Sequence, residues 1–194
     1  MADTNKVKFG IRSCYYAVIT EADDGTISYG NPVPFPGAVS LSLDPEGGEP
    51  EPFYADDIIY YQAPGGNSGY SGDFEVAKVP DSFRRDVLGE VTSQNGLLVE
   101  DADAVTKSFA LLAQFSGDKH NTRHVWYNCT ASRPSSGSQT IEETAEPQTE
   151  SITITSIPAT FGSRHIVKAK ASVGDTPYDD FFTAVTIPTF PAQG

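Results

Sequence analysis

Residues Phe53 to Val91 read FYADDIIYYQAPGGNSGYSGDFEVAKVPDSFRRDVLGEV, and they combine the signals of strand, turn, strand and helix. The first run, Ala55 to Gln62, is rich in β-branched and aromatic residues, whereas Asp73 to Val79 alternates charged with apolar residues. Gly, Asn and Ser cluster between the two runs. The stretch therefore predicts a β-hairpin with a long tip at Pro64 to Gly72.

A short helix is predicted after the second arm of this hairpin ends at Pro80. Asp81 is the expected N-cap, because its carboxylate can accept hydrogen bonds from unpaired N–H groups of the first turn. Phe83, Val87 and Leu88 share one face of such a helix. We therefore expect the helix to cover one sheet.

Strand signals continue on both sides of this stretch. SFALLAQFS at Ser108 to Ser116 is the most apolar run and predicts a central strand, which Arg123 to Ser132 should join as an antiparallel hairpin. In Ala38 to Leu43, alternation should point Val39, Leu41 and Leu43 inward. Further strands are expected at Tyr15 to Thr20, Thr26 to Tyr29, Leu97 to Glu100, Glu150 to Ile157 and His165 to Ser172, the last two as partners.

Length and composition agree with this pattern. A chain of 194 residues is most simply one domain, 1–194, and it can bury roughly 70% of its unfolded surface without metals or disulfides. The 17 glycines, 14 prolines and 11% aromatic residues favour an all-β, mainly antiparallel fold over a helical one. Cys14 and Cys129 are expected to be small buried residues.

The formal net charge of −13 argues against binding to nucleic acid or to an anionic membrane, since both need clustered lysine and arginine. No apolar stretch approaches the ~20 residues of a membrane span, and the N-terminal MADTNKVKFG lacks an apolar signal core. These features predict a chain that is made and kept in the cytoplasm.

Catalytic and metal-binding motifs are missing from the sequence. It contains no G-x-S-x-G, P-loop, H-E-x-x-H or C-x-x-C pattern. His120 and His124 lie in or beside a turn and strand, where a spacing of four does not place them on one helical face. The acidic clusters Glu21 to Asp24 and Asp44 to Pro52 lack the spacing of a calcium loop. We therefore predict no enzyme activity, no metal and no cofactor.

Three segments have no place in the predicted sheets. Asp44 to Pro52 holds only acids, glycines and prolines, and Arg133 to Pro147 is polar, so both are expected to be loops that lie in solvent or meet a partner. The C-terminal segment 173–194 is too apolar to be a free tail. It should dock on its own domain or on a neighbouring subunit.

The order of segments resembles that of the major tail protein family of long-tailed, non-contractile phages that infect Gram-positive bacteria. The resemblance is carried by NKVKFGIRSCYYAVIT from Asn5, by SLSLDP from Ser40, by the stretch Phe53 to Val91, and by HIVKAKA ending at Ala171. It implies a two-sheet β-sandwich or partly open barrel with one flanking helix. Six copies would form a ring, and stacked rings would form the tail tube that conducts genome DNA.

The implied partners are further copies of the chain and the tail terminator, tape measure and distal tail proteins of the same virion. DNA would pass without specific binding, and the tube would assemble in the host cytoplasm. By analogy with tail tubes, the hairpin tip and the two loops would make contacts between subunits or rings. Candidate assembly residues are Asp44, Glu46, Glu49, Glu51, Asn67, Tyr70, Glu142, Glu143, Glu146, Phe181 and Phe182; Asp73 and Glu75 are candidates for the lumen.

Two alternatives remain open from the sequence. A carbohydrate-binding β-sandwich would use exposed aromatic residues as a sugar platform, and Tyr60, Tyr61, Tyr70 and Trp126 are the candidates. The tube protein of a contractile tail or a secretion system would share the architecture of the favoured family.

Overall fold

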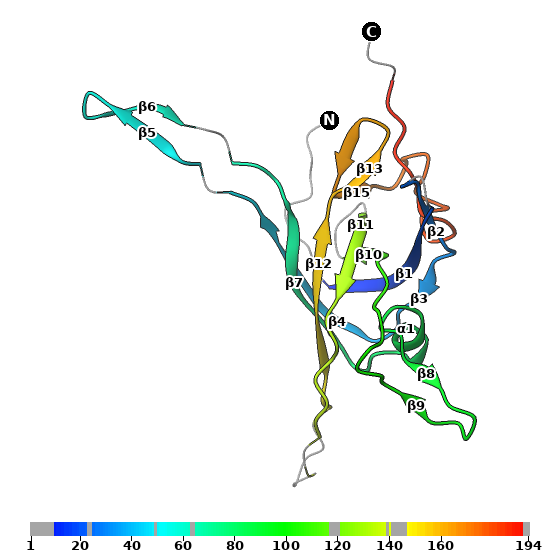
Figure 1. The fold of residues 1–194 in the computed structure, drawn as a ribbon. Coiled ribbons are helices and arrows are strands. Elements are labelled where there is room, and N and C mark those ends of the chain that lie inside the picture. The colour runs from blue at the N-terminus through cyan, green and yellow to red at the C-terminus, as the bar shows by residue number, and fades with distance from the viewer. Residues whose placement is uncertain are drawn as a thin grey trace.

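The computed structural model describes residues 10–22, 25–48, 50–62, 65–116, 121–138, 140 and 147–191. One large sheet dominates them, with the strand order β2-β1-β10-β11-β12-β7-β4, and β3 and β15 pair with β1 and β11 (Figure 1). Every pairing in this sheet is antiparallel. The sheet path runs from β2 to β4 without closing into a barrel. The predicted all-β, mainly antiparallel fold is confirmed.

The strands of the large sheet are β1 (Ile11–Glu21), β2 (Ile27–Tyr29), β3 (Val33–Pro34), β4 (Ala38–Glu46), β7 (Gly69–Val76), β10 (Phe109–Phe115), β11 (Arg123–Ala131), β12 (Glu150–Ile157) and β15 (Lys168–Ala171). Three separate hairpins complete the described strands: β5 (Pro52–Ala55) with β6 (Ile58–Gln62), β8 (Val91–Thr92) with β9 (Leu98–Val99), and β13 (Ala159–Phe161) with β14 (Arg164–Ile166). The helix α1 spans Asp81–Asp86.

The central hairpin of the sheet is β10 with β11, as predicted. Leu112 lies opposite Val125 in this ladder, and Leu111 lies opposite Trp126. From Phe109 to Gln114 every residue of β10 is buried, so both faces of the strand are covered. A continuous apolar run is the sequence pattern of such a strand, since neither of its faces meets water.

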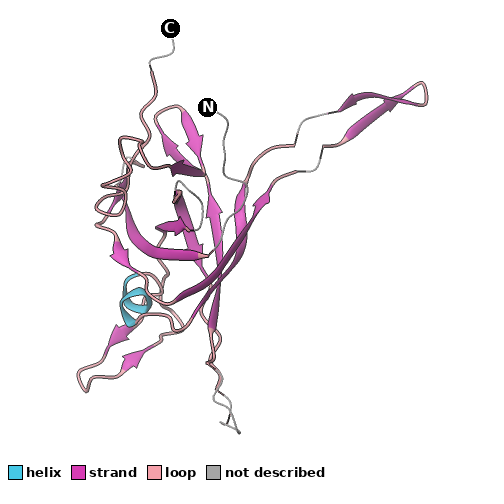
Figure 2. Cartoon of the chain, turned by 180° about the vertical axis from the view of Figure 1, so that it is seen from behind, coloured by secondary structure: helices cyan, strands magenta, loops and turns pink. Residues whose placement is uncertain are grey.

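The main core lies on one face of the sheet, under the helix (Figure 2). Phe83 of α1 is fully buried, and its ring centroid lies 4.9 Å from that of Phe35, 5.1 Å from that of Tyr16 and 5.3 Å from that of Phe109. Val87 and Leu88 are buried beside it. The prediction that the helix covers a sheet is confirmed. The predicted shared face is only partly helical, because α1 ends at Asp86 and the buried residues Val87 and Leu88 follow as its C-cap and the next residue.

A second core covers the opposite face of β1, β10 and β11, and the C-terminal segment forms its outer layer. Phe181 is buried there, and Phe182 stacks on Tyr15 with ring centroids 4.7 Å apart. The Tyr127 hydroxyl donates to the Thr186 carbonyl at 2.8 Å. The apolar residues of this segment therefore pack on their own chain at least as far as Thr186.

The predicted pairing of the opening stretch is wrong. β7 pairs with β4 on one side and with β12 on the other, whereas β6 pairs with β5 in a hairpin of its own. β7 buries Phe74 and Val76 and needs neighbours whose inward residues are also apolar, a condition that Leu41 and Leu43 of β4 meet. At Gly72 an added Cβ would lie 1.9 Å from the Ser42 carbonyl oxygen, so the two strands approach closely there.

The edge strand β4 also differs from the prediction. β4 continues to Glu46, so the first part of the expected loop at Asp44 to Pro52 is strand, with Pro45 opposite Tyr70. Val39 is 49% exposed, because the register of β4 shifts between Ala38 and Ser40. A bulge at this point turns one alternating residue out of the core.

The expected partnership of Glu150 to Ile157 with His165 to Ser172 is also wrong. β12 lies between β11 and β7. The second segment divides into β14, which pairs with β13, and β15, which extends the sheet beside β11. The turn at Gly162 lets the chain fold back at once, so a local hairpin replaces the longer-range pair.

The helix start was predicted one residue too late. Pro80 is the N-cap, and its carbonyl accepts a hydrogen bond from the Arg84 amide. Among the described residues, no side chain caps the helix. Asp81 is instead the first helical residue, where a carboxylate is favoured by the positive end of the helix dipole.

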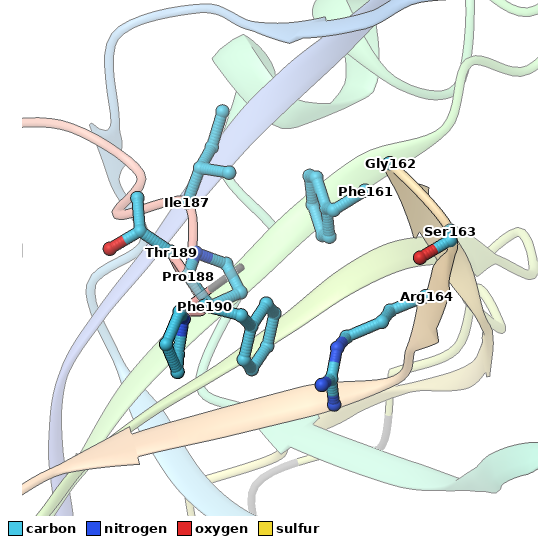
Figure 3. A pocket seen from close by; sticks show the side chains of 9 residues that line it. Phe161, Gly162, Ser163, Arg164, Ile187, Pro188, Thr189 and Phe190 are labelled. Carbon is cyan, nitrogen blue, oxygen red and sulfur yellow. The ribbon is translucent and has the colours of Figure 1, made fainter. Parts of the chain in front are cut away.

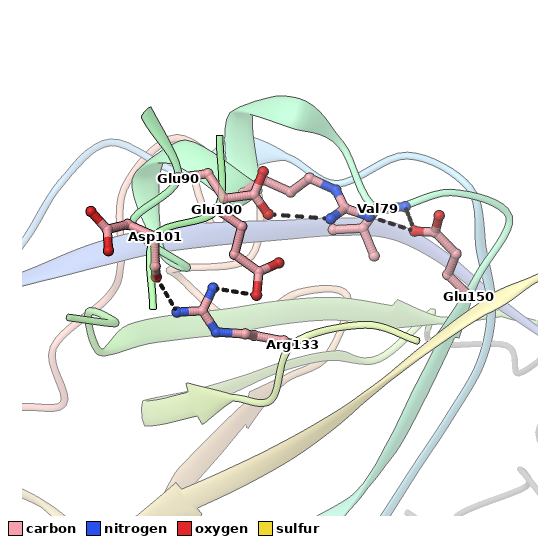
Figure 4. A network of polar contacts seen from close by, with 7 residues as sticks. Val79, Glu90, Glu100, Asp101, Arg133 and Glu150 are labelled. Carbon is pink, nitrogen blue, oxygen red and sulfur yellow. Dashed lines mark hydrogen bonds and ion pairs between the residues drawn. The ribbon is translucent and has the colours of Figure 1, made fainter. Parts of the chain in front are cut away.

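Two polar clusters fasten the chain around the helix (Figure 4). Arg84 Nη1 lies 3.2 Å from Glu90 Oε1, and its Nη2 lies 3.3 Å from Glu150 Oε2, which also accepts the Val79 amide at 2.8 Å. Arg133 Nη1 lies 2.9 Å from Glu100 Oε1. These contacts hold the ends of β11 and β12 against the helical side of the molecule, so we assign them a structural role.

Both cysteines are free and buried, as predicted. Burial raises the pKa of the Cys14 thiol and of the Cys129 thiol to about 12. Both thiols therefore stay protonated at neutral pH and are poor nucleophiles in the folded chain.

Candidate functional site: a polar sheet face and a projecting arm

Three neighbouring strands turn a continuous row of polar side chains away from the main core. The register places Ser42, Asp73 and Thr153 in one line across β4, β7 and β12. The residues between them in sequence, such as Phe74 and Ile152, point into the core on the other face. We define the polar face by Ser40, Ser42, Asp44, Ser71, Asp73, Glu75, Ser151, Thr153 and Thr155.

The carboxylates of the polar face are held by hydroxyl groups. Thr153 Oγ1 donates to Asp73 Oδ1 at 3.1 Å, and Ser40 Oγ donates to Glu75 Oε2 at 3.1 Å. Thr149 Oγ1 donates to the other oxygen of Glu75 at 2.5 Å. The sequences of β4, β7 and β12 contain no lysine or arginine. This face therefore carries negative charge and hydroxyl groups, and it repels polyanions.

The second feature is the β5–β6 hairpin, here called the arm, which projects away from the sheet (Figure 1). Asp56 and Asp57 form its turn with φ values of 51° and 60°, a left-handed conformation that aspartate tolerates better than most residues. Six large apolar residues of the arm are exposed, and Tyr60 reaches 71%: Phe53, Tyr54, Ile58, Ile59, Tyr60 and Tyr61. Contiguous exposed apolar surface of this kind marks an interaction site.

The sequence did not identify the arm as a separate site. Its signal is the run IIYY, which lacks the alternation of a half-buried strand and is preceded by two aspartates. A short run that is apolar on both faces is consistent with burial in a core as well as with exposure to a partner, so the sequence alone does not separate the two.

The candidate assembly residues lie in several places. Asp44 and Glu46 are on the edge strand β4, opposite Ser71 and Gly69 of β7. Glu51 is exposed just before the arm. Glu49, Glu142, Glu143 and Glu146 lie outside the described residues, as does much of the predicted loop Arg133 to Pro147.

The remaining candidates make contacts within their own chain. Asn67 Oδ1 accepts the Gly69 amide at 3.1 Å, which shapes the entry to β7. Tyr70 is half-buried, and Lys168 Nζ lies 4.2 Å from the centre of its ring. Phe181 is buried in the second core. The lumen candidates Asp73 and Glu75 both belong to the polar face.

The four aromatic residues of the carbohydrate alternative do not form one platform. Tyr60 and Tyr61 are on the arm, whereas Tyr70 packs under Lys168 on the sheet. Trp126 is 4% exposed and belongs to the main core. A sugar platform needs coplanar exposed rings at one site, and this arrangement does not supply them.

Among the described residues, no group of three or more His, Cys, Asp or Glu side chains could hold a metal ion. His165 Nδ1 lies 3.2 Å from the Thr160 hydroxyl on the β13–β14 hairpin, and His120 lies outside the described part of the chain. In that described part, no helix is long and apolar enough to cross a membrane.

The fold and these two surfaces define an all-β protein with an acidic sheet face and an exposed apolar arm. The chain belongs to the phage tail tube protein family, whose model matches residues 2–186. The resemblance to a major tail protein is thereby confirmed, and the chain is a structural component of a virion from a family that is not enzymatic. A comparison with curated proteins returned no match.

Proposed function

We propose that six copies of this chain form a ring and that stacked rings form the tail tube of a long-tailed, non-contractile phage, through which genome DNA leaves the virion. The polar face is the observation that carries this proposal, because it offers a broad surface of hydroxyl and carboxylate groups from three strands that contain no lysine or arginine. We place it toward the bore.

Electrostatics support this placement. Six copies of a chain with net charge −13 carry −78 formal charges per ring. Carboxylates that face the bore repel DNA over a Debye length of about 8 Å at physiological salt. A conduit that must release DNA needs such a wall, because cations would retain the phosphate backbone through counterion release.

Exposed strand edges and the arm support self-assembly. β4 ends the sheet with nine residues, Ala38–Glu46, and its outer edge has no partner among the described strands. An open edge of this length favours pairing with another chain, and a closed ring of identical copies removes that exposure. We further propose contacts with the tail terminator, tape measure and distal tail proteins, and assembly in the host cytoplasm.

Purified protein is expected to form rings or tubes as its concentration rises, since exposed edges and arms then meet neighbours. Negative-stain electron microscopy across a dilution series measures this directly. Monomers at every concentration would contradict the proposal, whereas tubes with a central channel would support it.

Asp73→Lys is expected to slow DNA release from virions severalfold, because it places a ring of cations in the proposed bore. Dye accessibility of the DNA after triggered ejection measures the rate. Asp103→Lys makes the same change of charge at an exposed turn away from the polar face and is the matched control. Equal rates of DNA release for the two variants would mean that a surface other than the polar face lines the bore.

A further inference from the structure

Charges of opposite sign are segregated along this chain. Between Arg12 and Lys78 the sequence has no lysine or arginine, and this span contains the arm with its two aspartates. Between Glu150 and Asp175 it has no acid. The second span carries Arg164, Lys168 and Lys170, all exposed. None of the ion pairs formed by described residues joins the two spans.

The cationic span borders a groove between the β13–β14 turn and the C-terminal segment (Figure 3). The groove has a volume of about 550 Å³. Ile187 is 47% exposed and Phe190 is 43% exposed, and the Arg164 guanidinium lies 4.3 Å from the centre of the Phe190 ring. The site thus has an apolar floor and a cation at its rim.

The arm has the complementary character. The two strands of the arm carry exposed apolar side chains, and Asp56 and Asp57 place two carboxylates at its turn. Figures 1 and 2 show that the arm leaves the sheet on the side away from the C-terminal segment, so the two surfaces of one chain face different directions. Two different surfaces that match each other define a head-to-tail contact, the kind that closes a ring or extends a stack.

We propose that the arm of one copy docks in the groove between the β13–β14 turn and the C-terminal segment of a second copy. The Asp56–Asp57 turn lies at Arg164, and the apolar side chains of the arm cover Ile187 and Phe190. This contact rests on the assembly proposed above and identifies the surface that receives the arm. Opposite charges at such a contact select the partner surface and fix its register.

Cross-linking of the full-length chain tests the contact. Ile58→Cys puts a thiol beside the arm turn, and Ser163→Cys puts one in the β13–β14 turn beside the groove. The two native thiols are buried and do not compete. With a short bismaleimide, a mixture of these variants is expected to give at least tenfold more cross-linked dimer than a mixture of Ile58→Cys with Gln94→Cys, which lies in the distant β8–β9 turn. Equal yields would overturn the proposal.

Charge substitution gives an independent readout. Arg164→Glu is expected to raise the protein concentration needed for assembly about tenfold or more, and Lys107→Glu, an equal change of charge at another exposed site, is expected to leave it unchanged. Asp56→Asn with Asp57→Asn should act like Arg164→Glu, because asparagine keeps the left-handed turn but removes the charge.

The outcomes separate this contact from the proposed function. Wild-type tubes that form without the specific cross-link, and that Arg164→Glu leaves unaffected, would overturn the arm contact alone. A wild-type chain that never assembles, with no cross-link above the Gln94→Cys control, would overturn both the contact and the tube.

Discussion

Replacing residues 49–64 with Asn-Gly is expected to leave the sheet folded and to abolish assembly. The junction is feasible, because an added Cβ on Gly65 would lie only 2.4 Å from the Gly48 carbonyl oxygen, so the chain leaving β4 and the chain entering β7 already lie side by side there. An Asn-Gly pair forms the type I′ turn that joins such strands. No residue of the arm belongs to either hydrophobic core. The melting temperature should therefore change little.

Assembly should fail because the variant loses six large exposed apolar side chains at once. Full burial of one such side chain contributes about 1.5–3 kcal/mol, so even partial burial of several supports a strong contact. Sedimentation velocity and negative-stain microscopy at matched concentrations measure the loss. Phe53→Ser with Tyr60→Ser keeps the hairpin and should give an intermediate defect. If the arm-deleted chain formed tubes of normal length, the arm would not contribute to the contacts between subunits.

Phe83→Ala is expected to cost about 3–5 kcal/mol of unfolding free energy. Phe83 is fully buried and packs edge-on against Tyr16 and Phe109, with interplanar angles of 89° and 90°. Alanine would leave a cavity at the point where α1 meets the sheet, and the ring contacts would be lost together. For a chain of this size the melting temperature should fall by roughly 10 °C.

Urea unfolding of the unassembled chain, followed by circular dichroism, measures this change. Phe53→Ala removes the same atoms from a ring that is 61% exposed on the arm, and it should alter the unfolding free energy by no more than about 0.5 kcal/mol. A loss below about 1 kcal/mol for Phe83→Ala would mean that the helix is not an integral part of the core.

Alternation along single strands was predictable, and so was the helix face. In β12, Ile152 and Ile154 are buried while Thr153 and Thr155 are exposed, as the sequence ESITITSI indicates. These features depend on a period of 2 for strands and 3.6 for helices, which any local window reveals. The candidates Asp73 and Glu75 could be placed on an outward face for the same reason.

The partners of the strands were not predictable in this way. The period of a strand says which residues share a face, but it does not say which strand lies beside it, since several apolar faces in one chain can match. The local sequence around β7 is compatible with a hairpin between β7 and the run Ala55 to Gln62. In the folded chain, however, β7 lies between β4 and β12. The bulge that exposes Val39 is equally invisible, because it arises from the register with β7.

The sequence by itself determined the class of fold, the net negative charge, the inward face of the helix and the membership of the tail tube family, because each depends on composition, period or the order of segments. Only the tertiary structure decided that β4, β7 and β12 unite their hydroxyl and carboxylate groups on one face, and that residues 52–62 form an exposed arm. The physical reason is that the burial of a side chain depends on residues far from it in sequence. Phe181 is buried because it packs in the second core, whereas Tyr60 is exposed because nothing among the described residues covers it.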